Sequence, residues 1–133
     1  MSEDLKKKKV LIIDDDLSFA RMIQLLLLRH SFDVLTSFSV ADARQKLGLD
    51  GNGVDLIILD LMMPEENGFD FLKWRDNASD ALKAIPIIVN TAKKVNDEEK
   101  KFLLLRCKCI VEKGMDFTNQ IVKRVIEFSG DKS

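Results

Sequence analysis

Val10-Leu-Ile-Ile-Asp-Asp-Asp16 passes directly from a continuous apolar run into three aspartates. A short run rich in β-branched residues, without polar alternation, is typical of a strand that is buried on both faces. Over residues 17–30 the apolar residues recur at helical spacing, and Asp16 is a suitable N-cap for that helix. The stretch therefore predicts a buried strand that ends in acidic residues and leads into a helix.

The alternation of strand and helix continues along the chain. Further strands are expected at residues 32–36, 54–59, 86–89 and 109–111, and further helices at residues 39–47, 68–77, 97–106 and 117–128. Ser39 and Asp116 are expected to cap two of these helices, and Asn96 or Asp97 a third. Apolar strands that alternate with helices predict an α/β fold, a doubly wound parallel sheet of five strands in a three-layer sandwich. One domain, with its core at about residues 8–129, accounts for all 133 residues.

Composition and charge disfavour several classes of protein. The chain has 21 basic and 22 acidic residues and a net charge of −1, so we expect no basic face and no nucleic-acid partner. No apolar run approaches the roughly 20 residues of a membrane span, and none resembles a secretory signal. The two cysteines, Cys107 and Cys109, are too few for a disulfide framework and are expected to pack in the core. A cytoplasmic location follows as an expectation.

Polar side chains follow four of the expected strands at their carboxyl ends. These residues are Asp14, Asp15, Asp60, Asn90, Thr91, Glu112 and Lys113. In a doubly wound sheet, ligands bind outside the carboxyl ends of the strands, near the point where the strand order reverses. With the strand order 2-1-3-4-5, the four strands are neighbours, so three carboxylates, a hydroxyl and an ammonium group gather in one crevice.

The chemistry of such a crevice is restricted. Three close carboxylates repel one another, so either a proton or a cation must join them. Oxygen ligands suit Mg²⁺ or Ca²⁺, and a site with few carboxylates and room for water and phosphate oxygens suits Mg²⁺ better. A metal and a lysine would neutralise the oxygens of a phosphoryl group, a hydroxyl would donate to one of them, and a carboxylate would attack in line. The pattern indicates phosphoryl transfer.

Five motifs occur in a fixed order along nearly the whole chain. They are Val10-Leu-Ile-Ile-Asp-Asp15, Val54-Asp-Leu-Ile-Ile-Leu-Asp60, Met63-Pro64 followed by Gly68, Pro86-Ile-Ile-Val-Asn-Thr-Ala92 and Ile110-Val-Glu-Lys113. The ordered set resembles the CheY-like receiver domains of two-component response regulators, which have a flavodoxin-like fold. The resemblance implies a signalling receiver that assists only its own phosphorylation and dephosphorylation. A sensor histidine kinase or a histidine phosphotransfer protein would supply the phosphoryl group from a phosphohistidine, with Mg²⁺ as cofactor, and the chain would switch its conformation and partner binding.

The resemblance also assigns the metal site and the acceptor. Asp60 would accept the phosphoryl group and bind Mg²⁺. Asp15 would bind the ion directly, and Asp14 would orient a metal-bound water. The backbone carbonyl of Met62 would be a further ligand.

Two more side chains would contact the phosphoryl group. Thr91 would bond one of its oxygens, and Lys113 would pair first with Asp60 and then with that group. The chain departs from the family pattern in two places. Gly114 stands where receivers usually have a proline, which leaves Lys113 less rigidly held, and Ile110 stands where they often have a switching aromatic residue. Both departures concern how phosphorylation would be passed on to an unknown downstream effector. The chain itself is expected to be a monomer or a phosphorylation-dependent dimer.

Two other functions fit parts of the pattern. Asp14-Asp-Asp16-Leu-Ser18 matches the Asp-x-Asp-x-(Thr/Ser/Val) motif of haloacid-dehalogenase-like phosphatases, in which Asp14 would be the nucleophile. The sequence shows no convincing cap domain and no second paired-acid motif for such a phosphatase, and this function would leave Asp60 unexplained. A binding module that signals without phosphorylation is the second alternative, and the intact acidic set argues against it.

Overall fold

A parallel sheet lies at the centre of the fold. The computed structural model describes residues 7–114 and 116–130. The five strands lie in the order β2-β1-β3-β4-β5, and every neighbouring pair is parallel, which confirms the expected doubly wound topology. The strands are β1 (Lys9–Ile13), β2 (Asp33–Ser37), β3 (Leu56–Asp60), β4 (Ile87–Thr91) and β5 (Cys109–Glu112).

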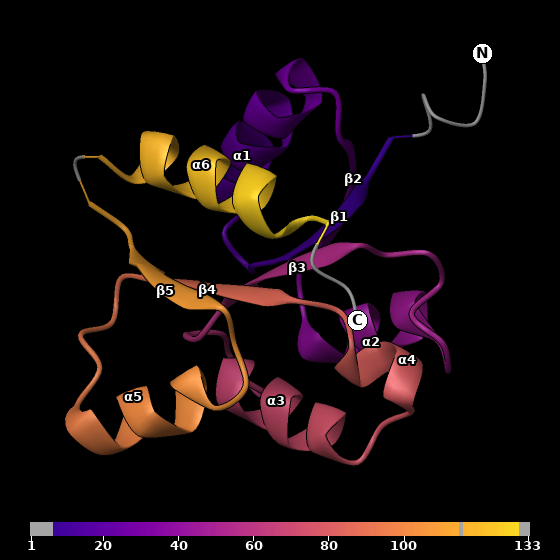
Figure 1. Cartoon of the computed structure of the whole chain (residues 1–133). Helices are drawn as coiled ribbons and strands as arrows, with labels where there is room; N and C mark the ends of the chain where they lie inside the picture. Colours follow the sequence, from indigo (N-terminus) through magenta and orange to yellow (C-terminus); the bar gives the residue numbers. More distant parts are fainter. Residues whose placement is uncertain (1–6, 115, 131–133) are drawn as a thin grey trace.

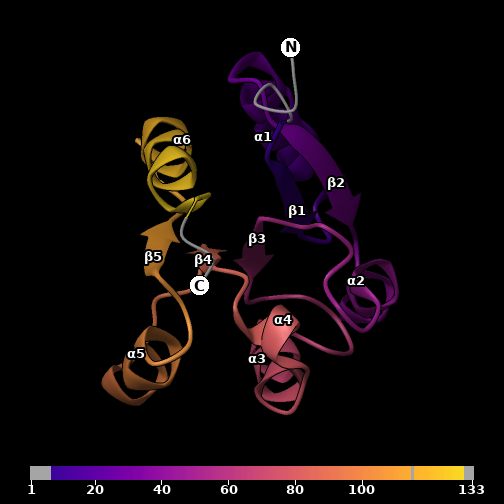
Figure 2. The same ribbon diagram turned by 45° about the vertical axis from the view of Figure 1, so that its right-hand side comes forward.

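Helices cover both faces of this sheet, as Figures 1 and 2 show. One face carries α1 (Leu17–Arg29) and α6 (Phe117–Phe128). The other carries α2 (Val40–Leu47), α3 (Gly68–Asp76), α4 (Asp80–Lys83) and α5 (Asp97–Leu104). The short helix α4 was not among the helices expected from the sequence. Its hydroxyl cap, Ser79, and its buried Leu82 explain why these few residues form a helical turn.

Two apolar cores lie on either side of the sheet because successive strand residues point to opposite faces. In β3, Ile58 packs with α1 and α6, whereas Ile57 and Leu59 pack with the helices of the other face. All five residues of β3 are buried, as the continuous apolar run predicted. Cys107 belongs to the core on the α3 side and Cys109 packs against the core on the α1 side, so both contribute to packing.

Side-chain caps fix the starts of most helices. Ser39 accepts from the N–H of Asp42, and Asn96, not Asp97, caps α5 in a capping box with Glu99. Asp116 occupies the N-cap position of α6, but the expected cap is wrong, because none of the N–H groups in the first turn of the helix bonds to its side chain. The Asp116 carboxylate instead accepts from the side-chain amide of Asn119 at 2.9 Å.

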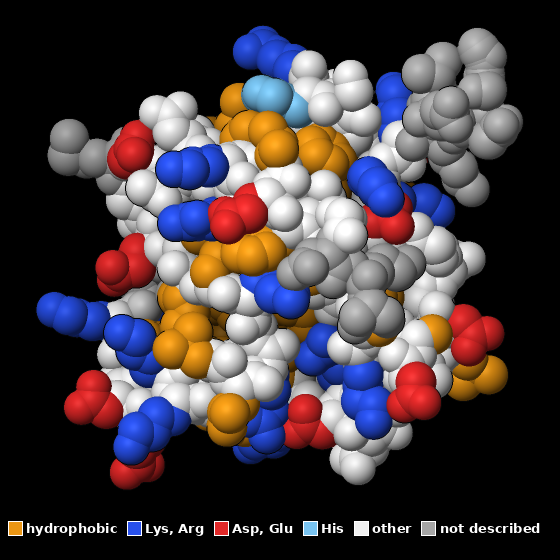
Figure 3. Space-filling model, viewed as in Figure 1, with side chains coloured by type: hydrophobic (Ala, Val, Ile, Leu, Met, Phe, Trp, Pro, Cys, Tyr) orange, Lys and Arg blue, Asp and Glu red, His pale blue; other side chains and the backbone are white. Residues whose placement is uncertain are grey.

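Charges of both signs are interspersed on the face of the molecule that Figure 3 shows, in keeping with the near-zero net charge. Within residues 7–114 and 116–130, none of the helices has the length and apolar character that crossing a bilayer requires.

Candidate functional site

Three carboxylates converge at the carboxyl edge of the sheet. Asp14 and Asp15 directly follow β1, and Asp60 is the last residue of the neighbouring strand β3. One carboxylate oxygen from each lies within 4.8 Å of the others. Asp14 and Asp60 are buried, whereas Asp15 is exposed to solvent. The geometry suits a single hard cation, because one oxygen of each residue can reach a common point.

The ammonium group of Lys113 lies beside the two buried acids. Its Nζ is 3.2 Å from Oδ2 of Asp14 and 3.8 Å from Oδ1 of Asp60. The backbone N–H of Lys113 donates to the carbonyl of Thr91 at 2.9 Å, which fixes the start of the side chain against the end of β4. The family resemblance implied a pairing of Lys113 with Asp60, and in the structure the nearer carboxylate is that of Asp14.

Thr91 and Met62 lie around the same cluster. Thr91 ends β4 and is buried, and its Oγ1 accepts the backbone N–H of Lys93 at 2.9 Å. That bond leaves the hydroxyl hydrogen of Thr91 available for donation. The backbone N–H of Met62 points at Oδ1 of Asp60 from 3.4 Å, a long contact. The loop after β3 therefore contacts the buried carboxylate through its own backbone.

The two buried carboxylates differ in how firmly they are held. Asp14 accepts the N–H of Asp16 at 2.9 Å on one oxygen and the Lys113 ammonium on the other. Among the described residues, Asp60 has only the long contact from Met62 and the more distant lysine. Asp60 is consequently the buried acid whose oxygens are less engaged within the described chain.

Burial and mutual repulsion favour the protonated forms of these acids. Burial, followed by the negative charge of Asp14, raises the pKa of Asp60 to about 6, against the opposing charge of Lys113. Burial likewise raises the pKa of Asp14, opposed by the N–H of Asp16 and by Lys113. A divalent cation would remove the repulsion and hold both groups ionised.

This raised pKa predicts a pH-dependent stability in metal-free solution. The folded protein binds the Asp60 proton more tightly than the unfolded chain, whose ordinary value is 3.8. The contribution of that proton to the free energy of unfolding is fully present below pH 4 and is lost as the pH rises through about 6. The total loss is as much as about 3 kcal/mol. Urea unfolding of the wild type and of Asp60→Asn should be measured in the presence of a chelator from pH 4 to 7. The free energy of unfolding of the wild type should fall relative to that of the variant as the pH rises. A difference that stays constant with pH would contradict the raised pKa.

Three further residues lie at the site, and none of them received a role from the sequence. Asn90 is fully buried, and neither atom of its amide has a hydrogen-bond partner among the described residues. Its strand register places it opposite Asp60 on the same face of the sheet. Gly68 fits tightly against the backbone of Asp60, and the ring of Phe19 lies 4.1 Å from the Lys113 ammonium. Asn90 had a signal as a polar residue at the end of an apolar strand and Gly68 as part of a motif, whereas nothing in the sequence pointed to Phe19.

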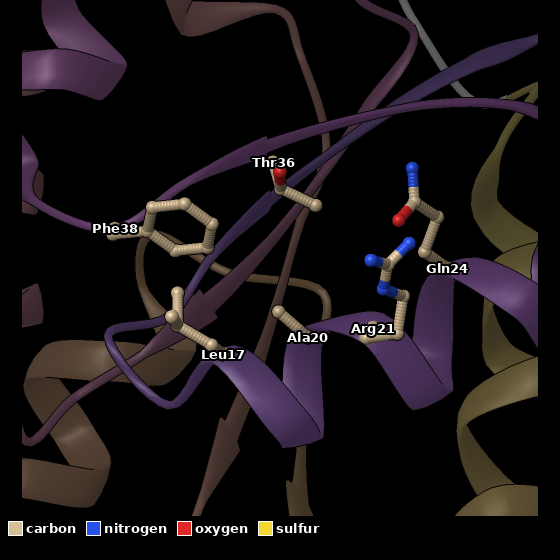
Figure 4. Close-up of a pocket in the computed structure, with 6 residues that line it drawn as sticks. All are labelled: Leu17, Ala20, Arg21, Gln24, Thr36 and Phe38. Atoms are coloured by element: carbon tan, nitrogen blue, oxygen red, sulfur yellow. The ribbon is translucent and has the colours of Figure 1, made fainter.

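A separate pocket of about 290 Å³ lies between α1 and the end of β2. In Figure 4, Leu17 and Phe38 form one side of it, and Arg21 and Gln24 lie toward the other. None of the three clustered aspartates lines this pocket. The acidic cluster is therefore distinct from this pocket.

Comparison with known families identifies one match. The family described as the response regulator receiver domain matches residues 10–126. Transcriptional regulatory protein CpxR of Escherichia coli (strain K12) is 35% identical over 85 residues, which cover 64% of this chain and 34% of that protein. The CpxR homolog of Haemophilus influenzae is 29% identical over 143 aligned positions, which cover 92% of this chain and 59% of that protein. The chain thus spans only about a third of the length of the Escherichia coli regulator.

Solved structures share the fold at low sequence identity. A response regulator receiver protein from Pseudomonas putida superposes with a TM-score of 0.81 at 23% identity, over 91% of this chain and 97% of that one. Chemotaxis protein CheY4 of Vibrio cholerae gives a TM-score of 0.78 at 24% identity, over 92% and 98% of the two chains. At these identities the likeness concerns the fold alone.

Proposed function

The chain belongs to the family of response regulator receiver domains, and from that premise we propose that it is a Mg²⁺-dependent switch that accepts a phosphoryl group on Asp60. The observation that carries the proposal is the convergence of carboxylates from β1 and β3 within 4.8 Å. The comparatively free oxygens of Asp60, next to the firmly held Asp14, support Asp60 as the acceptor.

The donor atoms at the cluster fit Mg²⁺. Asp15, Asp60 and the backbone carbonyl of Met62 would hold the ion directly and Asp14 would hold it through a water, all with hard oxygen atoms. When bound, the ion supplies positive charge that offsets the negative phosphoryl oxygens. Exposure of Asp15 leaves the site open to solvent and to a phosphodonor.

The side chains of the protein perform the rest of the transfer. A carboxylate oxygen of Asp60 attacks phosphorus in line, so that an O–P bond forms as the P–N bond of a phosphohistidine breaks. Lys113, already within 4 Å of Asp60, would neutralise charge on the transferred group. The Thr91 hydroxyl would donate its hydrogen to a phosphoryl oxygen and draw its loop toward the site.

This function places the chain in a two-component phosphorelay. A sensor histidine kinase or a histidine phosphotransfer protein would be the donor, and the chain would act in the cytoplasm as a signalling module. Output would use the face built by α5, β5 and α6, in a monomer or a phosphorylation-dependent dimer. On that face Ile110 is half-buried on β5, so the switch would operate without an aromatic residue at this position.

Chemical phosphorylation tests the assignment directly. Incubation with acetyl phosphate and Mg²⁺, followed by borohydride reduction and peptide mass spectrometry, should place the modification on Asp60 and nowhere else. Omission of Mg²⁺ should lower the yield by at least about tenfold, because the ion provides much of the charge neutralisation. Modification of Asp14 would instead support the phosphatase-like alternative. No modification, combined with no spectroscopic response to beryllofluoride, would support the binding module.

A further inference from the structure

The ammonium group of Lys113 has an aromatic neighbour as well as two acidic ones. Its Nζ lies 4.1 Å from the centroid of the Phe19 ring, which places the cation over the ring face. The carboxylates of Asp14 and Asp60 lie at 3.2 Å and 3.8 Å from the same nitrogen. A cation this close to an aromatic face is attracted by the negative charge density of the π system. The ammonium is thus bounded by carboxylates and by an apolar ring.

We propose that Phe19 is a positioning residue for phosphoryl transfer, whose ring holds the Lys113 ammonium beside Asp60. The kinetic consequence rests on the proposed function, whereas the contact itself does not. Phe19 does not touch the reacting atoms in this arrangement and acts through the lysine. The role would be to keep a flexible cation at the point where the phosphoryl oxygens will arrive.

The need for such a support follows from the residue after the lysine. Lys113 lies just beyond β5, an edge strand, and is followed by Gly114. A Cβ at position 114 would find no atom within 4 Å, so Gly114 leaves open space beside the lysine. A lysine also carries a long side chain with several rotatable bonds. The backbone hydrogen bond to Thr91 fixes where the side chain begins, and the ring defines where it ends.

The ring is itself held from two directions. The carboxylate of Asp16, the N-cap of α1, accepts the backbone N–H of Phe19 at 3.1 Å, which fixes Phe19 in the first turn of the helix. The ring of Phe117, the first residue of α6, packs against it with centroids 5.0 Å apart. Phe117 is buried, so this second ring anchors the first to the core. Of the three successive aspartates, Asp14 and Asp15 therefore belong to the acidic cluster, whereas Asp16 orients Phe19, whose ring lies against the lysine.

The contact can be tested by NMR without any phosphorylation. Protons held over an aromatic face are shifted upfield, so the side-chain methylene next to Nζ of Lys113 should resonate upfield of the other lysines. Lys113→Ala identifies the signal by its disappearance. Phe19→Leu should return it to the ordinary position, and Phe19→Trp, which keeps an aromatic face, should retain an upfield shift. An ordinary shift in the wild type would overturn the proposal, whatever the protein's function.

The kinetic test compares phosphorylation of Asp60 by acetyl phosphate in the same variants. Phe19→Leu should slow the reaction roughly fivefold, equivalent to about 1 kcal/mol, and Phe19→Trp should restore most of the rate. Phe128→Leu is the matched control: Phe128 is another half-buried phenylalanine packed against the same core, and its replacement leaves the ring over the lysine in place, so it should slow the reaction much less. In a Lys113→Ala background, Phe19→Leu should have no further effect, as a residue acting through the lysine requires.

The outcomes separate this proposal from the function it builds on. An unmodified wild type refutes the proposed function, while the NMR shift still decides the contact. A wild type modified on Asp60, with Phe19→Leu reacting at the wild-type rate, overturns the positioning role alone. Equal slowing by Phe19→Leu and Phe128→Leu, or slowing that persists without Lys113, would mean that Phe19 contributes only to packing and would overturn the proposal too. Should Phe19→Leu fail to fold, Phe19→Met provides the non-aromatic comparison.

Discussion

Asp60→Asn is expected to abolish phosphorylation by acetyl phosphate while leaving the protein folded. The amide has nearly the shape of the carboxylate but is not a nucleophile toward phosphorus, so the rate should fall by more than roughly a thousandfold. The substitution also removes a charge that is buried beside Asp14, so the fold should be retained and should be more stable than the wild type above pH 6 without metal. Intact-mass spectrometry measures the modification, and urea unfolding measures the stability.

Asp50→Asn provides the control for this experiment. Asp50 is an exposed aspartate in the turn after α2, so its loss should leave the yield of phosphorylated protein unchanged. Two observations would argue against Asp60 as the acceptor. One is a wild-type yield in Asp60→Asn, and the other is a modification that remains on Asp14 in that variant. Loss of the label together with loss of the folded state would require Asp60→Glu as a second probe, which should fold and remain poorly modified.

The sequence predicted the position of the acids because that position depends only on backbone topology. In a parallel sheet all carboxyl ends point to one edge, so residues that directly follow two apolar strands must lie at the same edge. With β1 and β3 adjacent, Asp14 and Asp60 are neighbours whatever their rotamers. The strand order and the helical layers were predictable for the same reason, from apolar runs that alternate with amphipathic segments.

Contacts made by long side chains could not be predicted in this way. Lys113 reaches Asp14 more closely than Asp60, and its ammonium lies over Phe19, a residue 94 positions away in sequence (113 − 19). These contacts depend on four side-chain torsions and on how α1 and α6 pack, which no periodicity encodes. The absence of a side-chain cap at Asp116 was unpredictable for a similar reason, because its carboxylate accepts from the side-chain amide of Asn119 and not from the helix backbone.

Gly68 is a residue whose importance the sequence indicated only by resemblance, and the structure supplies the physical reason. It is the first residue of α3, and its N–H donates to the carbonyl of Leu61 at 3.1 Å. A Cβ at this position would lie 2.6 Å from the carbonyl oxygen of Asp60 and 2.9 Å from Cα of Leu61. Both are backbone atoms of the strand end that presents the proposed acceptor, so neither can move away as a flexible side chain would.

Gly68→Ala should therefore destabilise the fold and impair phosphorylation together. The overlap forces α3 away from the end of β3, at a cost of roughly 1 to 3 kcal/mol in the free energy of unfolding. A displacement of Asp60 by a fraction of an ångström also disturbs in-line attack, and we expect the rate of modification to fall by roughly tenfold to a hundredfold. Urea unfolding gives the first quantity, and mass spectrometry under conditions in which the variant is fully folded gives the second.

Gly114→Ala separates steric overlap from the general effect of replacing a glycine near the site. Gly114 adjoins Lys113, yet an added Cβ would meet nothing within 4 Å, and its φ lies outside the left-handed region. The free energy of unfolding of Gly114→Ala should differ from that of the wild type by no more than about 0.5 kcal/mol, and the variant should be phosphorylated at nearly the wild-type rate. If Gly68→Ala behaved in the same way, α3 could not be packed against the Asp60 carbonyl as closely as the structure has it. If only Gly68→Ala loses both stability and rate, the small residue at the start of α3 is required because it lets the helix abut the backbone that carries the acceptor.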